Sequence, residues 1–73
     1  MSELCLHNRL LEHRTRQGLT QAALAEAVGV SRKTVNTIEN RVFVPSTVLA
    51  LRLAACLGTT VEELFWLEDE SGP

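Results

Sequence analysis

The chain has 73 residues, of which 45% are hydrophobic and 22% are charged, a composition typical of one small globular domain. It contains no apolar run close to the about 20 residues of a membrane-spanning helix and no signal-peptide pattern, so we expect a cytoplasmic protein with no membrane partner. The net charge of −2 hides an asymmetry, because residues 1–60 carry seven cations and four acids, whereas residues 61–73 carry five acids. A basic body with an acidic end keeps nucleic acid among the candidate partners.

In chain order, the residue pattern predicts an all-α domain that spans residues 1–73. Alternating side chains over residues 4–7 permit a short strand. Helical patterns then run over residues 8–16, 21–28, 32–40, 47–57 and 61–64. A second short strand over residues 65–68 can pair with the first, and residues 71–73 are expected to fray. The helix over residues 47–57 is apolar nearly all round, so one side faces the core and another suits a partner.

Residues 20–40 form the unit around which the chain is organised. Gly29 interrupts the helical pattern, and Ser31 is placed to cap the next helix by accepting from a backbone N–H. Val30, before this cap, and Val35, after it, are spaced for a hydrophobic staple. Two short helices joined by a tight turn that contains glycine indicate a helix-turn-helix.

The second helix of this unit carries a polar outer face that spreads over about 140° of its circumference. It holds two cations, two amides and one hydroxyl, and no acid: Arg32, Lys33, Asn36, Thr37 and Asn40. Arg and Lys suit guanine edges or phosphates, Asn suits adenine or phosphate, and the Thr methyl suits thymine. These residues favour a helix that reads the major groove. The alternative is an ordinary solvated face on a small bundle.

Several short motifs in a fixed order give the sequence a recognisable likeness. They are GLTQ at residues 18–21, LA at 24–25, GVS at 29–31, TV-x-x-IEN at 34–40, PS at 45–46 and VEELF at 61–65. With these motifs, the sequence resembles the stand-alone, lambda-repressor-like kind of Cro/cI-type helix-turn-helix regulators over about residues 8–65. The resemblance implies a five-helix DNA-binding domain whose second and third helices form the reader.

The resemblance also implies roles for individual residues. The base-reading positions are Arg32, Lys33 and Thr37, with Asn36 as a further candidate, and the positions on the phosphate backbone are Gln21, Ser31 and Asn40. The family's usual glycine after Asn40 is Arg41 here. Because Arg is strained in a left-handed conformation, either the turn differs or Asn40 takes that conformation, and Arg41 is a candidate for an added phosphate contact.

Two structural contacts follow from the same resemblance. Arg14 and Glu39 match a pair that forms a buried salt bridge between the first and third helices in some relatives, and both lie on inward edges of their helices; the alternative is that both reach solvent. Relatives of this kind form symmetric dimers with a two-stranded sheet from the two termini. The predicted dimer contacts are Cys56, Leu57, Val61, Leu64 and Trp66, unless Trp66 only covers the monomer core.

The sequence therefore predicts a DNA-binding, nucleoid-associated transcriptional regulator, a repressor that binds a palindromic operator as a homodimer. The alternative is an antitoxin or another protein-binding module that also regulates its own operon. An enzyme is not expected, because no nucleophile–base–acid set and no phosphate loop is present. No cofactor is expected. No metal is expected either, because Cys5, His7, His13 and Cys56 follow no zinc spacing, and the two distant cysteines fit a reduced protein better than a disulfide.

Overall fold

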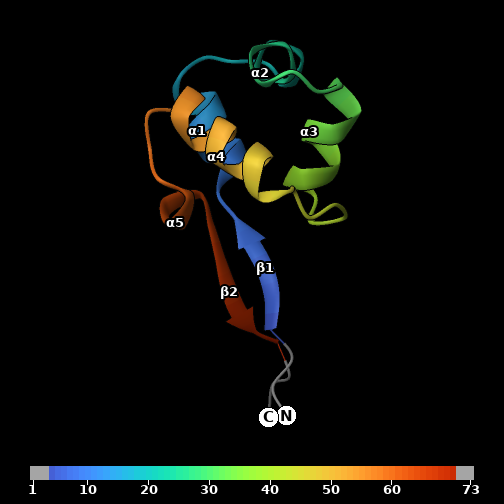
Figure 1. Cartoon of the computed structure of the whole chain (residues 1–73), viewed down its shortest axis with the longest axis vertical. Coiled ribbons are helices and arrows are strands. Elements are labelled where there is room, and N and C mark those ends of the chain that lie inside the picture. The colour runs from blue at the N-terminus through green and yellow to red at the C-terminus, as the bar shows by residue number, and fades with distance from the viewer. Residues whose placement is uncertain (1–3, 71–73) are drawn as a thin grey trace.

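A computed structural model describes residues 4–70 and shows five helices and two strands within that range (Figure 1). Their bounds are β1 Leu4–Asn8, α1 Leu10–Arg16, α2 Gln21–Val28, α3 Arg32–Glu39, α4 Thr47–Cys56, α5 Val61–Leu64 and β2 Phe65–Asp69. The predicted five-helix fold with a small sheet from the two ends of the chain is confirmed. The expected fraying of residues 71–73 concerns residues outside the described range.

Side-chain hydroxyls start four of the helices. Thr20, Ser31, Ser46 and Thr60 each accept a hydrogen bond from the backbone N–H three residues further on, which satisfies a donor that the helix itself leaves open. Helix α1 begins two residues later than predicted. The reason is Asn8, which still pairs in the sheet and whose Oδ1 accepts from the N–H of Leu10 at 3.1 Å.

The core lies where α1 to α5 meet the base of the sheet. Its members are apolar and at most 8% exposed: Leu10, Leu24, Ala25, Val28, Val35, Ile38, Leu49, Ala50, Leu53, Ala54, Leu57, Leu64 and Phe65. Every helix contributes at least one of them, so the positions of α2 and α3 are fixed by shared packing and not by the turn alone. Within residues 4–70, no helix has the length and apolar character that crossing a membrane requires.

The two strands form an antiparallel ribbon that projects from the helical body, which makes the molecule 40 Å long and about half as wide (Figure 1). Leu6 lies opposite Leu67, and His7 lies opposite Trp66. Because successive side chains alternate between faces, one face of the ribbon is largely apolar and the other is polar. The first of these ribbon faces carries Leu4, Leu6, Phe65 and Leu67. The second, the polar face of the ribbon, carries Cys5, His7, Trp66 and Glu68.

Candidate nucleic-acid interface

Helices α2 and α3 are joined by the short turn that the sequence predicted. Gly29 has a φ of 79°, a left-handed conformation that glycine adopts without a Cβ penalty. The N–H of Val30 then returns to the carbonyl of Ala25 at 3.0 Å, which closes the end of α2. Val30 is half-buried against the core, and Val35, one turn into α3, is fully buried. The turn is therefore held by backbone hydrogen bonds and by packing.

The outer face of α3 is polar and open to solvent. Arg32, Lys33 and Asn36 are exposed, whereas Thr37 is half-buried and its hydroxyl donates to the carbonyl of Thr34 at 2.9 Å. Because the hydrogen of that hydroxyl is engaged within the helix, Thr37 presents only a methyl group and a hydrogen-bond acceptor to a ligand. The acid of this helix, Glu39, faces inward with a side chain that is 6% exposed. The outer face thus combines two cations with neutral polar groups.

A buried ion pair fixes the inner side of α3. Arg14 Nε donates to Glu39 Oε2 at 2.7 Å, and Arg14 Nη2 donates to Glu39 Oε1 at 3.3 Å. The remaining Nη1 donates to the carbonyl of Leu19 at 2.8 Å, which also ties the segment between α1 and α2. The predicted salt bridge between the first and third helices is present, and the two-point geometry holds α3 at a fixed angle to α1.

Three amide side chains extend this ion pair to the surface. Gln21 Nε2 donates to Glu39 Oε1 at 2.9 Å and to Asn36 Oδ1 at 3.1 Å. Asn40 Nδ2 donates to the backbone carbonyl of Asn36 at 2.9 Å and to the side-chain Oδ1 of Asn36 at 3.2 Å. The amide network, as we call Gln21, Asn36 and Asn40, connects the first residue of α2 with the outer face of α3.

The structure changes how the predicted phosphate contacts can be made. Gln21 and Asn40 use both side-chain hydrogens within the protein, so neither amide can donate to a phosphate in this conformation. The backbone N–H of Gln21 lies in the first turn of α2, where N–H groups have no partner within the helix, so it can still donate to a phosphate. Ser31 Oγ accepts from the N–H of Thr34 and lies 3.0 Å from the Thr34 hydroxyl, either of which can be the donor in that pair.

Arg41 adopts the strained conformation at the exit of α3. Its φ is 62°, whereas Asn40 has a φ of −88°. Both predicted alternatives are therefore wrong, because the turn keeps its left-handed position and Arg41 occupies it. The N–H groups of Arg41 and Val42 return to the carbonyls of Ile38 and Thr37, the pattern of a Schellman motif.

The guanidinium of Arg41 contacts the ribbon. Its Nη1 lies 2.9 Å from His7 Nδ1, and its Nη2 donates to Glu70 at 3.3 Å. The side chain predicted to add a phosphate contact is engaged by the polar face of the ribbon instead.

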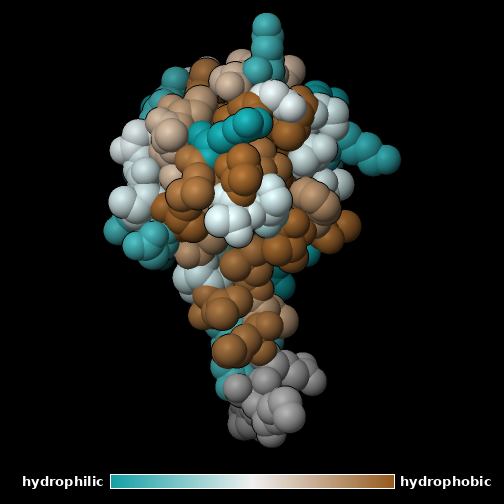
Figure 2. All heavy atoms as spheres, in the orientation of Figure 1, coloured by the Kyte–Doolittle hydropathy of each residue, from teal (hydrophilic) through white to brown (hydrophobic). Residues whose placement is uncertain are grey.

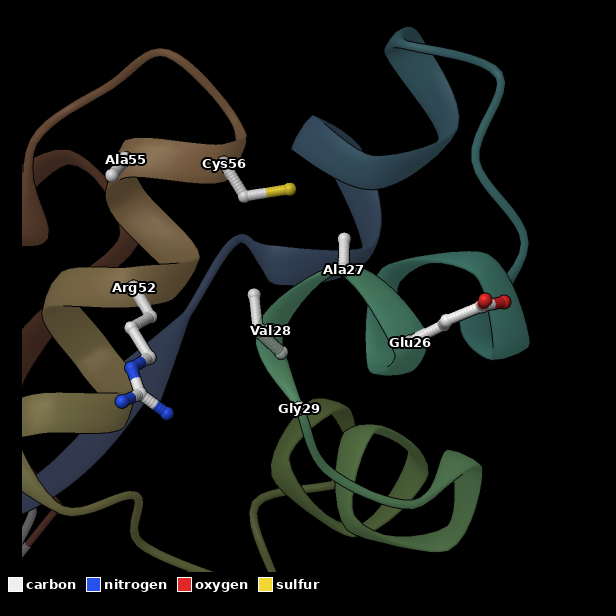
Figure 3. A pocket seen from close by; sticks show the side chains of 7 residues that line it. All are labelled: Glu26, Ala27, Val28, Gly29, Arg52, Ala55 and Cys56. Carbon is white, nitrogen blue, oxygen red and sulfur yellow. The ribbon is translucent and has the colours of Figure 1, made fainter.

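Two of the five predicted dimer contacts, Leu57 and Leu64, are corrected by the structure. Leu57 and Leu64 are 3% and 0% exposed because they fill the core of the monomer. Cys56 borders a hollow between α2 and α4 that Arg52 and Gly29 also line (Figure 3). Val61 lines a different hollow, which lies between α4, α5 and the ribbon.

Trp66 lies on the polar face of the ribbon and is engaged within the monomer. It stacks on His7, the guanidinium of Arg9 lies 5.0 Å from its ring centroid, and its Nε1 donates to Glu68. The predicted dimer residues therefore separate into two core residues, one residue at each of two hollows and one on the ribbon.

Exposed apolar side chains gather on one surface, around the hollow that Val61 lines. Figure 2 shows it as a brown area that runs from the helical body onto the ribbon. Val44, Val48, Leu51, Leu4 and Leu67 are between 56% and 66% exposed, and a hollow among them is bordered by Leu6, Pro45, Ala50, Val61 and Phe65. We call this surface the apolar face. The sequence indicated it only through the helix that is apolar nearly all round.

Known proteins share this arrangement. A family model described as Helix-turn-helix matches residues 10–64. The uncharacterized HTH-type transcriptional regulator YgzD of Bacillus subtilis is 42% identical over 66 residues, which are 90% of this chain and 100% of that protein. The structure of the restriction-modification controller protein C.AhdI from Aeromonas hydrophila matches with a TM-score of 0.71 and 38% identity, over 75% of this chain and 83% of that chain. A shorter match, 50% identical over 50 residues, covers 68% of this chain and 45% of Antitoxin HigA-1 from Vibrio cholerae.

The fold and the outer face of α3 define a helix-turn-helix DNA-binding domain. The chain belongs to the Cro/cI-type helix-turn-helix family, whose model covers more than half of it. It is therefore a DNA-binding regulator of transcription, and its family is not a class of enzymes. Among residues 4–70, no group of three His, Cys, Asp or Glu side chains lies close enough together to hold a metal.

Proposed function

We propose that this protein is a repressor that binds a palindromic operator as a homodimer, with one α3 in the major groove of each half-site. The observation that carries the proposal is the outer face of α3, which is basic, free of acid and exposed, on a helix held from behind by the Arg14–Glu39 ion pair. A rigid support matters because base edges are discriminated by hydrogen bonds whose geometry tolerates little error.

In this proposal Arg32, Lys33, Asn36 and Thr37 contact bases. Ser31 and the backbone N–H of Gln21 contact phosphates, which sets the register of α3 in the groove. Asn40 and Arg41 do not contact DNA in this proposal, because the donors of Asn40 are engaged in the amide network and those of Arg41 are engaged by the ribbon. The ribbon projects from the end of the helical body opposite α2 (Figure 1).

The apolar face is the surface on which we place the second copy. Scattered exposed apolar residues are normal, but a continuous group across α4, the preceding loop and the ribbon marks an interaction site. A chain of 73 residues buries only about 60% of its unfolded surface, so pairing adds stability that the monomer lacks. Two copies related by a two-fold axis would place their α3 helices about one turn of DNA apart.

The test is selection of bound sites from random double-stranded DNA, combined with sedimentation of the free protein. The proposal expects an inverted repeat with half-site centres about 10 bp apart and a dimer at micromolar concentration. A single unrepeated site, bound by a protein that stays monomeric with and without DNA, would overturn the homodimer.

A second candidate is an antitoxin that also binds its own operator. The match to Antitoxin HigA-1 favours it, although the chain spans about half of that protein. In this case the apolar face would hold a partner protein instead of a second copy. The two candidates differ in what covers this face. An antitoxin would form a one-to-one complex with the product of an adjacent gene, and that complex would sediment as a heteromer whose formation the substitution Leu51→Glu prevents.

A further inference from the structure

The direction of each amide in the amide network is fixed by partners that can only accept. Gln21 lies against the Glu39 carboxylate, so the group that meets Glu39 must be its nitrogen, Nε2. Asn40 lies against the backbone carbonyl of Asn36, so its inward group must also be nitrogen. Both nitrogens then send their second hydrogen to the side chain of Asn36, at 3.1 and 3.2 Å.

These two donors determine the orientation of Asn36. Only an oxygen can accept from them, so Asn36 must turn Oδ1 into the network, and its two lone pairs are both occupied. The Nδ2 group points the other way. No described residue accepts from it, and Asn36 is exposed on the outer face of α3. Asn36 therefore presents two donors and no acceptor on the outer face of α3.

We propose that Asn36 is a donor-only reader, which recognises a base edge rich in acceptors, and that Gln21 and Asn40 are the positioning residues that make it so. This inference rests on the proposed entry of α3 into the major groove. A free Asn side chain pairs with adenine through one donor and one acceptor, whereas a locked Asn36 has no acceptor for the adenine amino group. Guanine, with N7 and O6 side by side, fits two donors best, and thymine O4 fits one.

The first experiment locates the base pair that Asn36 reads. Sites are selected from random DNA with the native protein and with Asn36→Ala, and Lys33→Ala serves as the control for loss of a different contact. We expect Asn36→Ala to relax the preference at one base pair of each half-site by at least about fivefold. A variant that relaxes no position would show that Asn36 reads no base and would overturn the inference.

The second experiment tests the chemistry at that pair with modified bases. If the pair is G·C, replacing guanine N7 by a carbon should weaken the native protein severalfold and leave Asn36→Ala unchanged. If the pair is A·T, removing the adenine amino group should leave native binding unchanged. Loss of native binding when that amino group is removed would mean that Asn36 accepts a hydrogen bond, which contradicts the lock.

Release of the lock gives the complementary result. In Gln21→Met/Asn40→Ala, Asn36 can turn over, so the preference at the same pair should broaden to admit adenine by about fivefold or more. An unchanged preference in this variant, when its folding is intact by circular dichroism, would contradict the positioning roles.

A measurement on the free protein separates this inference from the proposed function. Hydrogen exchange of the side-chain amides, followed by NMR, should be slow for Gln21 and Asn40 and fast for Asn36. Protection of the Asn36 amide hydrogens would overturn the lock whether or not the protein binds DNA. If no sequence is selected but the exchange pattern is as expected, the proposed function fails and the orientation of the amides stands.

Discussion

Arg14 and Glu39 are 25 positions apart in the sequence and form a two-point ion pair with side chains that are only 10% and 6% exposed. Glu39 also accepts a hydrogen bond from Gln21, so the ion pair and this bond together link α1, α2 and α3. A buried ion pair adds little net stability against an apolar pair of the same shape, but it fixes one geometry.

Substitutions at this pair should therefore be strongly non-additive. Arg14→Met leaves a buried carboxylate without its cation, and we expect a loss of about 3–5 kcal/mol in the free energy of unfolding. Arg14→Met/Glu39→Met removes both charges and should recover most of that loss. Urea unfolding of both single variants and of the double variant measures the coupling. Losses that simply add would contradict a charge pair that depends on both members.

Arg41 allows backbone strain to be measured separately from side-chain contacts. Arg41→Ala and Arg41→Gly both remove the guanidinium that contacts His7 and Glu70, but only glycine is relaxed at a φ of 62°. Arg41→Gly should therefore be more stable than Arg41→Ala by about 1 kcal/mol. Thermal or denaturant unfolding gives the difference. Equal stabilities would mean that the exit of α3 is not held in a left-handed conformation.

The apolar face offers a matched pair of substitutions for the homodimer. Leu51 is 56% exposed and lines the hollow of this face, whereas Leu11, on α1, is 51% exposed and is not among the residues that line it. Leu51→Glu should raise the dimer dissociation constant by at least about tenfold, because a charge cannot be buried unpaired. Leu11→Glu should leave it unchanged. Sedimentation velocity across a concentration series compares them, and equal effects of the two substitutions would remove this face from the interface.

Stability in acid should depend on Glu70. A hydrogen bond from the Cys5 thiol lowers the pKa of Glu70 below its ordinary value of 4.5, and the charges of Arg41 and His7 add to the effect, while desolvation opposes it. Since the folded form holds this proton less tightly than the unfolded chain, the stabilisation is complete above pH 4.5 and disappears as the pH falls through the lowered pKa.

The measurement compares the native protein with Glu70→Gln. The native protein should be the more stable above pH 4.5, and the difference should vanish in stronger acid. A difference that stayed constant across this range would mean that Glu70 titrates alike in the folded and unfolded chains. A solvent-exposed carboxylate makes a small contribution, so unfolding in urea at several pH values is the suitable assay.

Local signals made most of the fold predictable. The bounds of α2 were predicted to the residue, because Thr20 and Gly29 carry their cap signals in their own chemistry. The pairing of the two chain ends followed from alternation and from a known kind of relative. The Arg14–Glu39 contact came from the resemblance, since nothing local links positions 25 apart.

The missed features depend on which way a side chain points. Sequence identified Asn36 and Asn40 as members of a polar face, but rotamers in three dimensions decide that they bond to each other. Leu64 was assigned to the dimer because apolar character alone does not tell a core position from a surface one. Asn8, whose Nδ2 donates to the carbonyl of Ile38 at the end of α3, was missed as a support of the reader. The sequence feature that could have identified this role of Asn8 is its position as a polar residue at the junction of a strand and a helix.

The most direct test of the central claim is the ratio of affinities for the selected operator and for random DNA. If α3 reads sequence, Arg32→Ala should lower this ratio by about tenfold, equivalent to about 1.4 kcal/mol, while changing the affinity for random DNA much less. The loss should be concentrated at one base pair per half-site. An unchanged ratio in both Arg32→Ala and Lys33→Ala would contradict the assignment of α3 as the recognition helix.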